Sequence, residues 1–89
     1  MDKAQKQSLK RQAHHLKPTV IIGQAGLSEQ VIVAIEEALE SHELIKIKLP
    51  QIPPAERKVL ALNLCEDIGA TMIQSIGRTV TLYRASEQK

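Results

Sequence analysis

Hydrophobic residues recur every three or four positions in three segments of the chain, as they do along one face of a helix. Four shorter segments are either continuously apolar or alternate between apolar and polar residues, which is typical of strands. The predicted helices are residues 2–16, a segment that follows Ser28, and a segment from Pro53 or Pro54 to about Ile68. The predicted strands are Thr19–Ile22, Leu44–Leu49, Thr71–Ile76 and Thr79–Arg84. The order of elements is therefore α-β-α-β-α-β-β.

The ends of the predicted helices carry residues that favour helix starts and stops. Asp2 and Ser28 are N-cap residues, whose side-chain oxygens accept hydrogen bonds from N–H groups of the first turn. Pro18 ends the first helix, and Gly69 ends the third in a left-handed conformation. The apolar faces comprise Leu9, Ala13 and Leu16, then Val31, Ile32, Ile35, Ala38 and Leu39, and finally Leu60, Ala61, Leu64, Cys65 and Ile68.

The predicted strands differ in their patterns. Segment Leu44–Leu49 alternates cleanly, so that Lys46 and Lys48 share one face and that face meets water. Segment Thr19–Ile22 is nearly all apolar, which indicates a strand that is covered on both sides or central in the sheet. The last two strands are joined by Gly77-Arg78, a connection that suits a type II′ hairpin. In Thr71–Ile76 the inward residues are either Met72 and Ile76, or Ile73.

These elements predict an α/β two-layer sandwich with a four-stranded mixed sheet and the helices chiefly on one side. Each strand-helix-strand unit is expected to place parallel strands side by side, and the final hairpin adds an antiparallel pair. A chain of 89 residues forms a single domain, 1–89. Residues 85–89 are expected to fray.

The composition excludes several classes of protein. Hydrophobic residues make up 43% and charged residues 25%, which is typical of a globular domain. There is one Tyr and no Phe or Trp, so RRM-like sheets and aromatic-rich OB barrels are disfavoured. One Cys cannot form an internal disulfide, and the longest apolar run, Val31–Ile35, is far shorter than a membrane span. We therefore expect a cytoplasmic protein without membrane contact.

The sequence shows no set of residues that predicts an enzyme. His14 and His15 point about 100° apart on a helix and do not bind one metal ion together. His42 stands alone, and Cys65 lies on an apolar helix face. No pair of carboxylates stands out on an apolar face as an acid and a base. We predict no catalytic residue, no metal, no cofactor and no small-molecule substrate.

The net charge of +2 is unevenly distributed. Residues 1–17 carry +4, whereas the remainder carries −2. On the first helix the basic residues and one histidine form a stripe beside the apolar face, with Arg11 next to it, and no acid follows Asp2. Such a stripe is either a solvated face or a surface for a polyanion. The stripe consists of Lys3, Lys6, Lys10, His14 and Lys17.

A glycine-rich turn, Gly23-Gln24-Ala25-Gly26, separates the first strand from the second helix. Two glycines allow backbone N–H groups to approach a phosphate closely, and the helix dipole favours negative charge there. The turn lacks the residues of a P-loop or a dinucleotide fingerprint, and a plain strand-to-helix turn is the alternative. Because Lys17 lies six residues before Gly23, we expect the loop and the basic stripe to form one surface, as in KH-type modules that hold RNA.

Several motifs in order carry a resemblance to a known family. The chain resembles the YhbY family, the stand-alone bacterial form of the CRM domain, for chloroplast RNA splicing and ribosome maturation. The resemblance extends from about Gln5 to Arg84. The motifs are Leu16-Lys17-Pro18, Ile22-Gly23-x-x-Gly26-Leu27, His42-Glu43-Leu44-Ile45-Lys46-Ile47-Lys48, Gly69-Ala70, Ile76-Gly77-Arg78 and Leu82-Tyr83-Arg84.

The resemblance implies an RNA-binding domain similar in fold to the C-terminal domain of bacterial translation initiation factor three. Bacterial members are associated with precursors of the large ribosomal subunit, and plant proteins with several copies act in group II intron splicing. Carried over by position, the RNA-binding residues are Gly23, Gln24, Ala25 and Gly26, with Lys10, Arg11 and Lys17 beside them. Many relatives have Lys or Arg in this loop. Here Gln24 and Ala25 are neutral, so contact would depend on backbone amides.

The resulting hypothesis is a monomer that binds ribosomal RNA through the loop and the stripe, with modest sequence preference. Lys46 and Lys48 either contact RNA or keep the sheet face soluble, and Arg78 and Arg84 are equally open. The alternative is a dimeric interaction module such as an Alba-like protein. Its candidate patch is Val59 and Leu62, which we expect the first helix to cover.

Overall fold

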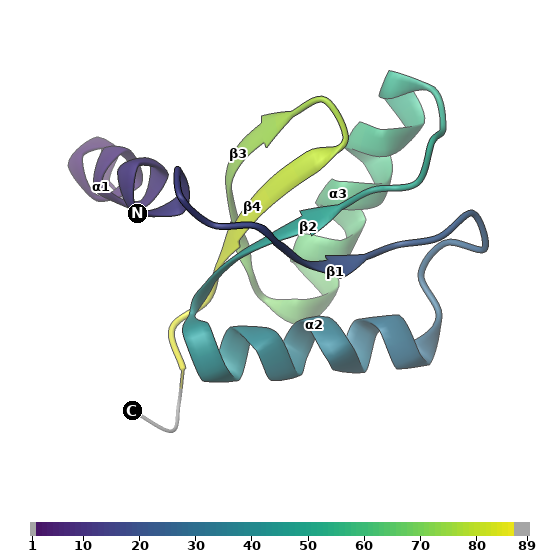
Figure 1. Cartoon of the computed structure of the whole chain (residues 1–89), viewed down its shortest axis with the longest axis horizontal. Helices are drawn as coiled ribbons and strands as arrows, with labels where there is room; N and C mark the ends of the chain where they lie inside the picture. Colours follow the sequence, from purple (N-terminus) through teal and green to yellow (C-terminus); the bar gives the residue numbers. More distant parts are fainter. Residues whose placement is uncertain (1, 87–89) are drawn as a thin grey trace.

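The computed structural model describes residues 2–86 and has the predicted order of elements, with a four-stranded mixed sheet (Figure 1). The strand order in the sheet is β1-β2-β4-β3. The helices are α1 (Lys3–Ala13), α2 (Glu29–His42) and α3 (Pro54–Ile68). The strands are β1 (Pro18–Ile21), β2 (Leu44–Lys48), β3 (Thr71–Ile76) and β4 (Thr79–Tyr83).

The predicted helix caps are confirmed. Asp2 accepts a hydrogen bond from the Gln5 N–H at 2.7 Å, and the Gln5 side chain returns to the Asp2 backbone in a capping box. Ser28 accepts from the Val31 N–H, and Gly69 ends α3 with φ 66° and ψ 33°.

Helix α1 ends at Ala13, three residues earlier than predicted. The His14 N–H donates to the Arg11 carbonyl and the Leu16 N–H to the Ala13 carbonyl. These hydrogen bonds join residues three positions apart, as in a 3₁₀ turn, and β1 then begins at Pro18. Pro18 disfavours the helical conformation at Lys17, the residue before it, and α1 already ends at Ala13.

The main core lies between one face of the sheet and the two helices α2 and α3. The buried apolar side chains of β2 and β4 point to this face, where they meet the apolar faces of both helices, whereas the buried Thr81 of β4 lies on the opposite face. These residues are Ile22, Ile35, Ala38, Leu39, Ile45, Ile47, Leu49, Ala61, Leu64, Cys65, Ile68, Val80 and Leu82. The predicted two-layer packing is therefore present between the sheet and these two helices.

Helix α1 packs at one end of the opposite sheet face, against β2 and β3. Ala13 and Ile73 are both buried, yet neither belongs to the main core cluster. The strand pairing of β3 is irregular between Met72 and Gln74, which turns Ile73 to this second face. Met72 packs against the main core, whereas Ile76 is 65% exposed. Neither alternative is correct as stated, because Met72 meets the main core without Ile76, and Ile73 is buried outside that core.

Two expectations about the sheet are wrong. Strand β1 is an edge strand and is mostly exposed, with Ile21 at 67%, although its apolar run indicated a covered strand. Strands β2 and β3 are not neighbours, because β4 returns from the hairpin and pairs with β2. At the hairpin Gly77 has a positive φ and Arg78 does not, as a type II′ turn requires.

The end of the chain is ordered further than expected. Ser86 is buried, and its N–H and hydroxyl donate to the Glu43 and Glu40 carboxylates at 2.7 and 3.0 Å. The rest of the segment expected to fray, residues 87–89, lies outside the described part of the chain.

Candidate nucleic-acid interface

The glycine loop is an open turn at the surface. The Gly26 N–H donates to the Gly23 carbonyl at 3.0 Å, and Gly26 has φ +83°. A Cβ atom placed on either glycine would meet no atom within 4 Å. Gln24 and Ala25 form the exposed tip, and their N–H groups make no hydrogen bond to residues 2–86. Backbone donors at this tip are therefore accessible to an anion.

The basic stripe of α1 is also open to solvent. Its cations form no ion pair with any residue in the range 2–86, and Asp2 is used as the helix cap. Lys10 and Arg11 lie in the last turn, where they complement the negative end of the helix dipole. Exposed or half-exposed are all the residues of the stripe, Lys3, Lys6, Lys10, His14 and Lys17, and also the adjacent Arg11.

The loop and the stripe do not adjoin, which corrects the expectation of one continuous surface. In Figure 1 they lie at opposite ends of the longest dimension of the molecule, which measures 33 Å. Strand β1 separates them, and six residues of extended chain from Lys17 to Gly23 span about 20 Å. Short spacing in the sequence did not mean proximity here, because the connecting segment is extended.

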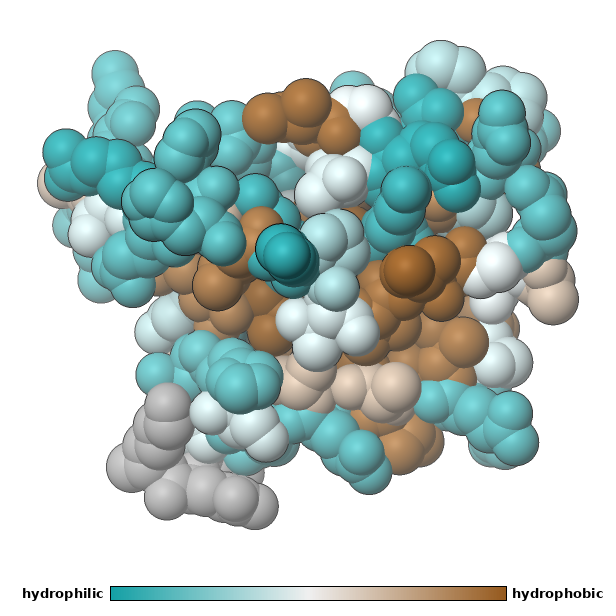
Figure 2. All heavy atoms as spheres, in the orientation of Figure 1, coloured by the Kyte–Doolittle hydropathy of each residue, from teal (hydrophilic) through white to brown (hydrophobic). Residues whose placement is uncertain are grey.

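The open sheet face lies between these two ends. Lys46 and Lys48 project from it, since Ile45 and Ile47 on the same strand point into the core. Figure 1 shows this face with α3 behind the sheet, and Figure 2 shows hydrophilic side chains over α1 and apolar patches over the sheet.

The sequence and the fold both match known proteins over nearly the whole chain. The model of the CRS1/YhbY (CRM) domain matches residues 1–84. The chain belongs to this family. Two curated relatives cover 94% of this CRM domain. An RNA-binding protein of Haemophilus influenzae is 42% identical over 85% of its own length. Bacillus subtilis YqeI, named a probable RNA-binding protein, is 36% identical over 88% of its length.

A solved structure supports the same assignment. The solution structure of a Staphylococcus aureus protein, described as a candidate RNA-binding protein, superposes on this CRM domain with a TM-score of 0.84. The identity is 34%, and the match covers 98% of this chain and 91% of the other.

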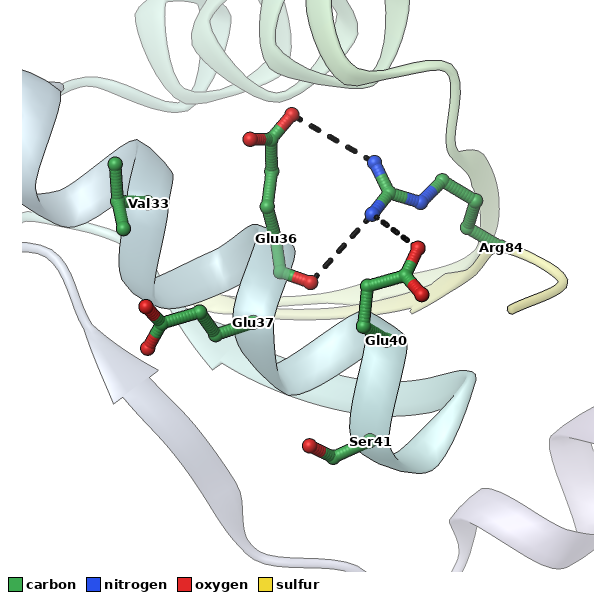
Figure 3. Close-up of a pocket in the computed structure, with 6 residues that line it drawn as sticks. All are labelled: Val33, Glu36, Glu37, Glu40, Ser41 and Arg84. Atoms are coloured by element: carbon green, nitrogen blue, oxygen red, sulfur yellow. Dashed lines mark hydrogen bonds and ion pairs between the residues drawn. The ribbon is translucent and has the colours of Figure 1, made fainter. Parts of the chain in front are cut away.

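Arg84 is one of the two arginines whose role the sequence left open. Its side chain forms ion pairs and hydrogen bonds with other residues of this CRM domain (Figure 3). Its guanidinium lies 3.2 Å from Glu40 and 3.7 Å from Glu36, and it donates to the Ile68 carbonyl at 2.9 Å. Only 20% of the side chain is exposed. Arg84 therefore ties the end of β4 to both α2 and α3.

The other arginine, Arg78, holds the hairpin against the end of β2. Its Nε donates to the Leu49 carbonyl at 3.0 Å, and the Leu49 N–H donates to the Arg78 carbonyl at 2.6 Å. The Nε is therefore occupied by a hydrogen bond within the fold. This contact could not be predicted from the sequence, because its two partners are 29 positions apart.

The residues considered for chemistry lie apart. Cys65 is buried in the core, and burial raises the pKa of its thiol, which disfavours the reactive thiolate. The rings of His14 and His15 meet edge to face with centroids 5.3 Å apart. Within residues 2–86, no three His, Cys, Asp or Glu side chains are arranged to hold a metal ion, and no helix is long and apolar enough to cross a membrane.

The apolar pair on α3 is uncovered, contrary to expectation. Val59 is 57% and Leu62 50% exposed, because α1 packs on the other side of the sheet. Val59 lines a shallow hollow with Ile52, Ala55 and Leu60.

Proposed function

We propose that this CRM domain is a cytoplasmic RNA-binding protein that associates with ribosomal RNA of large-subunit precursors during ribosome assembly. The names of its relatives support RNA as the partner, and the family resemblance supports the ribosomal target. The observation that carries the proposal is the separation of charge between the two sides of the sheet.

Acidic residues are concentrated on the side of α2 and α3. Eight of the ten acids of the chain lie in these two helices or at the end of α2, from Glu29 to Asp67. Segments 44–53 and 70–86 contain no acid, and residues 3–17 contain none either. The acidic side formed by α2 and α3 repels a polyanion, whereas the side that carries α1 and the lysines of β2 attracts one.

The proposed contacts are of two kinds. The loop Gly23-Gln24-Ala25-Gly26 offers backbone amides to phosphates, and the α1 stripe with Arg11 offers positive charge. Since about 20 Å of extended chain from Lys17 to Gly23 separates them, a bound strand has to extend along the molecule to reach both. Without aromatic platforms, binding depends mainly on phosphates and has modest sequence preference.

The salt dependence of RNA binding tests this proposal. With about four to six phosphates neutralised, the log–log slope of affinity against salt on single strands should be about −3 to −4. Fluorescence anisotropy with fragments of large-subunit ribosomal RNA measures this slope. Affinity that hardly changes between low and moderate salt would contradict the phosphate-based mechanism.

The ribosomal target needs its own measurement. The protein should sediment with immature large subunits in sucrose gradients and be absent from mature ones. Co-sedimentation with mature subunits only, or with none, would contradict the proposed target while leaving RNA binding intact.

A dimeric interaction module is the second candidate, and the exposed Val59 and Leu62 favour it. Stable dimers bury about 800 Å² on each partner, and two side chains supply a small part of that area. We therefore propose a monomer. Sedimentation velocity at low concentration decides the matter, since a stable dimer would favour the second candidate.

A further inference from the structure

The open sheet face carries a regular arrangement of side chains between the two proposed contact regions. The strand register places Ile21, Lys48, Thr79 and Ile76 in one row across all four strands. The next row contains Lys46, Thr81 and Gln74. Successive strands lie about 4.8 Å apart, so the first row spans about 14 Å.

The two lysines occupy the gap between the stripe and the loop. Lys46 pairs with Pro18, the neighbour of Lys17, and Lys48 pairs with Ile21, two residues before Gly23. Lys46 and Lys48 are about 7 Å apart along β2, since they are separated by two residues of extended chain. Positive charge therefore continues from the end of α1 to the start of the glycine loop.

The surface around the lysines is hollowed. One hollow lies between α1 and the sheet and is lined by Lys10, Arg11, His14, His15 and Gln74. A second lies on the sheet and is lined by Lys46, Gln74, Ile76, Thr79 and Thr81. Gln74 belongs to both, so the two hollows adjoin, and neither is lined by an acid.

Protection of a sheet edge does not account for these lysines. Lysine is a common guard of exposed edge strands. Strand β2 is interior, with β1 paired on one side and β4 on the other. On the same face, Ile21 beside Lys48 is 67% exposed and Ile76 beside Thr79 is 65% exposed, so both apolar side chains are accessible to a ligand.

We propose that the open sheet face holds a single-stranded RNA segment that runs between the α1 stripe and the glycine loop. Lys46 and Lys48 bind its phosphates, Gln74 and Thr79 offer hydrogen bonds, and Ile21 and Ile76 contact bases. This inference rests on the proposed function and adds to it a surface and its residues. The uniform positive charge selects a polyanion rather than a protein partner.

Matched charge reversals test the phosphate contacts. Lys48→Glu and Lys58→Glu change the net charge equally, but Lys58 is exposed on α3, on the far side of the sheet. The probe is a fluorescein-labelled oligouridylate of about 12 nucleotides, long enough to cross the sheet. Lys48→Glu should weaken binding about tenfold and flatten the salt slope by about 0.7, and Lys58→Glu should change both much less.

Apolar substitutions test the base contacts separately. Ile21→Thr with Ile76→Thr keeps β-branched residues on the strands and should weaken binding about fivefold without changing the salt slope, because no charge is removed. Val33→Thr, at an exposed apolar residue of α2, is the control and should have no effect. Thermal unfolding of each variant confirms that the fold persists.

The outcomes separate this inference from the proposed function. If variants of the loop and the α1 stripe lose RNA while Lys48→Glu and the isoleucine pair bind as the wild type does, the sheet-face path is wrong and the proposed function stands. If the wild-type protein does not bind the oligonucleotide or any ribosomal RNA fragment, the proposed function itself fails. If the isoleucine pair instead abolishes a dimer in sedimentation velocity, the face is an interface between copies and the inference is overturned.

Discussion

The two sides of the sheet use their charged residues differently. On the side of α2 and α3, Arg84 is surrounded by Glu36 and Glu40 and by backbone carbonyls, so its charge is satisfied within the protein. On the side of α1 and the open sheet face, the lysines form no ion pair with residues 2–86. A paired cation contributes to stability, and an unpaired cation is available to a partner. Substitutions on the two sides should therefore separate stability from binding.

The largest effect is expected from Arg84→Met, which removes the charge but keeps much of the aliphatic stem. Loss of the charge-assisted hydrogen bonds should lower the free energy of unfolding by about 2–3 kcal/mol. RNA affinity should stay within about twofold, because this side does not face the partner. Urea unfolding and anisotropy measure the two quantities.

Arg84→Lys is the matched control for that substitution. It keeps the charge and loses the planar fork, so its stability should lie between those of the wild type and Arg84→Met. A folded Arg84 variant with greatly weakened RNA binding would show that the paired side also contacts RNA.

The reverse result is expected for Lys10→Glu combined with Lys17→Glu on the unpaired side. Two lost phosphate contacts should weaken RNA binding about thirtyfold and flatten the salt slope by about 1.4. The free energy of unfolding should fall by only about 0.5 kcal/mol, because an acid near the end of α1 opposes the helix dipole. Anisotropy titrations at several salt concentrations, with Lys58→Glu as the control, measure the difference. Unchanged affinity would remove the stripe from the site.

The two glycines of the loop provide a smaller and sharper test. Gly26→Ala places a side chain at φ +83° and should lower the free energy of unfolding by about 1–2 kcal/mol. Gly23 has no positive φ, so Gly23→Ala should change stability by less than about 0.5 kcal/mol. Its methyl group projects into open space, where it should keep a phosphate from the amides and cost about tenfold in affinity. Urea unfolding and RNA titration of both variants measure these effects. Wild-type affinity in Gly23→Ala would mean that the loop does not hold RNA.

The smallest effect is a pH dependence that arises in the core. Burial raises the pKa of the Cys65 thiol above its value in the unfolded chain. The unfolded state then loses its proton first, so stability should be constant at low pH and should fall as the pH rises above about 9. Urea unfolding between about pH 7 and pH 10 should show a steeper loss for the wild type than for Cys65→Ala. Equal slopes would mean that Cys65 does not contribute.

Local features of the fold could be predicted from the sequence because they depend on neighbouring residues. Asp2, Ser28 and Gly69 are where helix-capping chemistry requires them, and the alternation of residues 44–49 gives the face of each side chain directly. Strand β1 was misjudged because an apolar run does not reveal whether a partner strand lies on both sides. The bulge at Ile73 shifts the alternation of β3, and no pattern in that segment signalled it.

The candidate site was harder to predict, because it depends on distances between elements. The loop and the α1 stripe were recognised by residue type, but the roughly 20 Å of extended chain between Lys17 and Gly23 was overlooked. That length was available from the predicted strand itself. The hydrogen bonds and ion pairs of Arg84 join residues up to 48 positions apart, so only the folded chain shows them.

Amide chemical-shift mapping of the 15N-labelled protein during titration with the oligouridylate tests most directly whether RNA binds to the α1 stripe, the glycine loop and the open sheet face. We expect shifts in residues 23–26, at the end of α1 and along β2, while the exposed faces of α2 and α3 remain unchanged. Shifts concentrated around the acidic residues of α2, or around Val59 and Leu62, would contradict it.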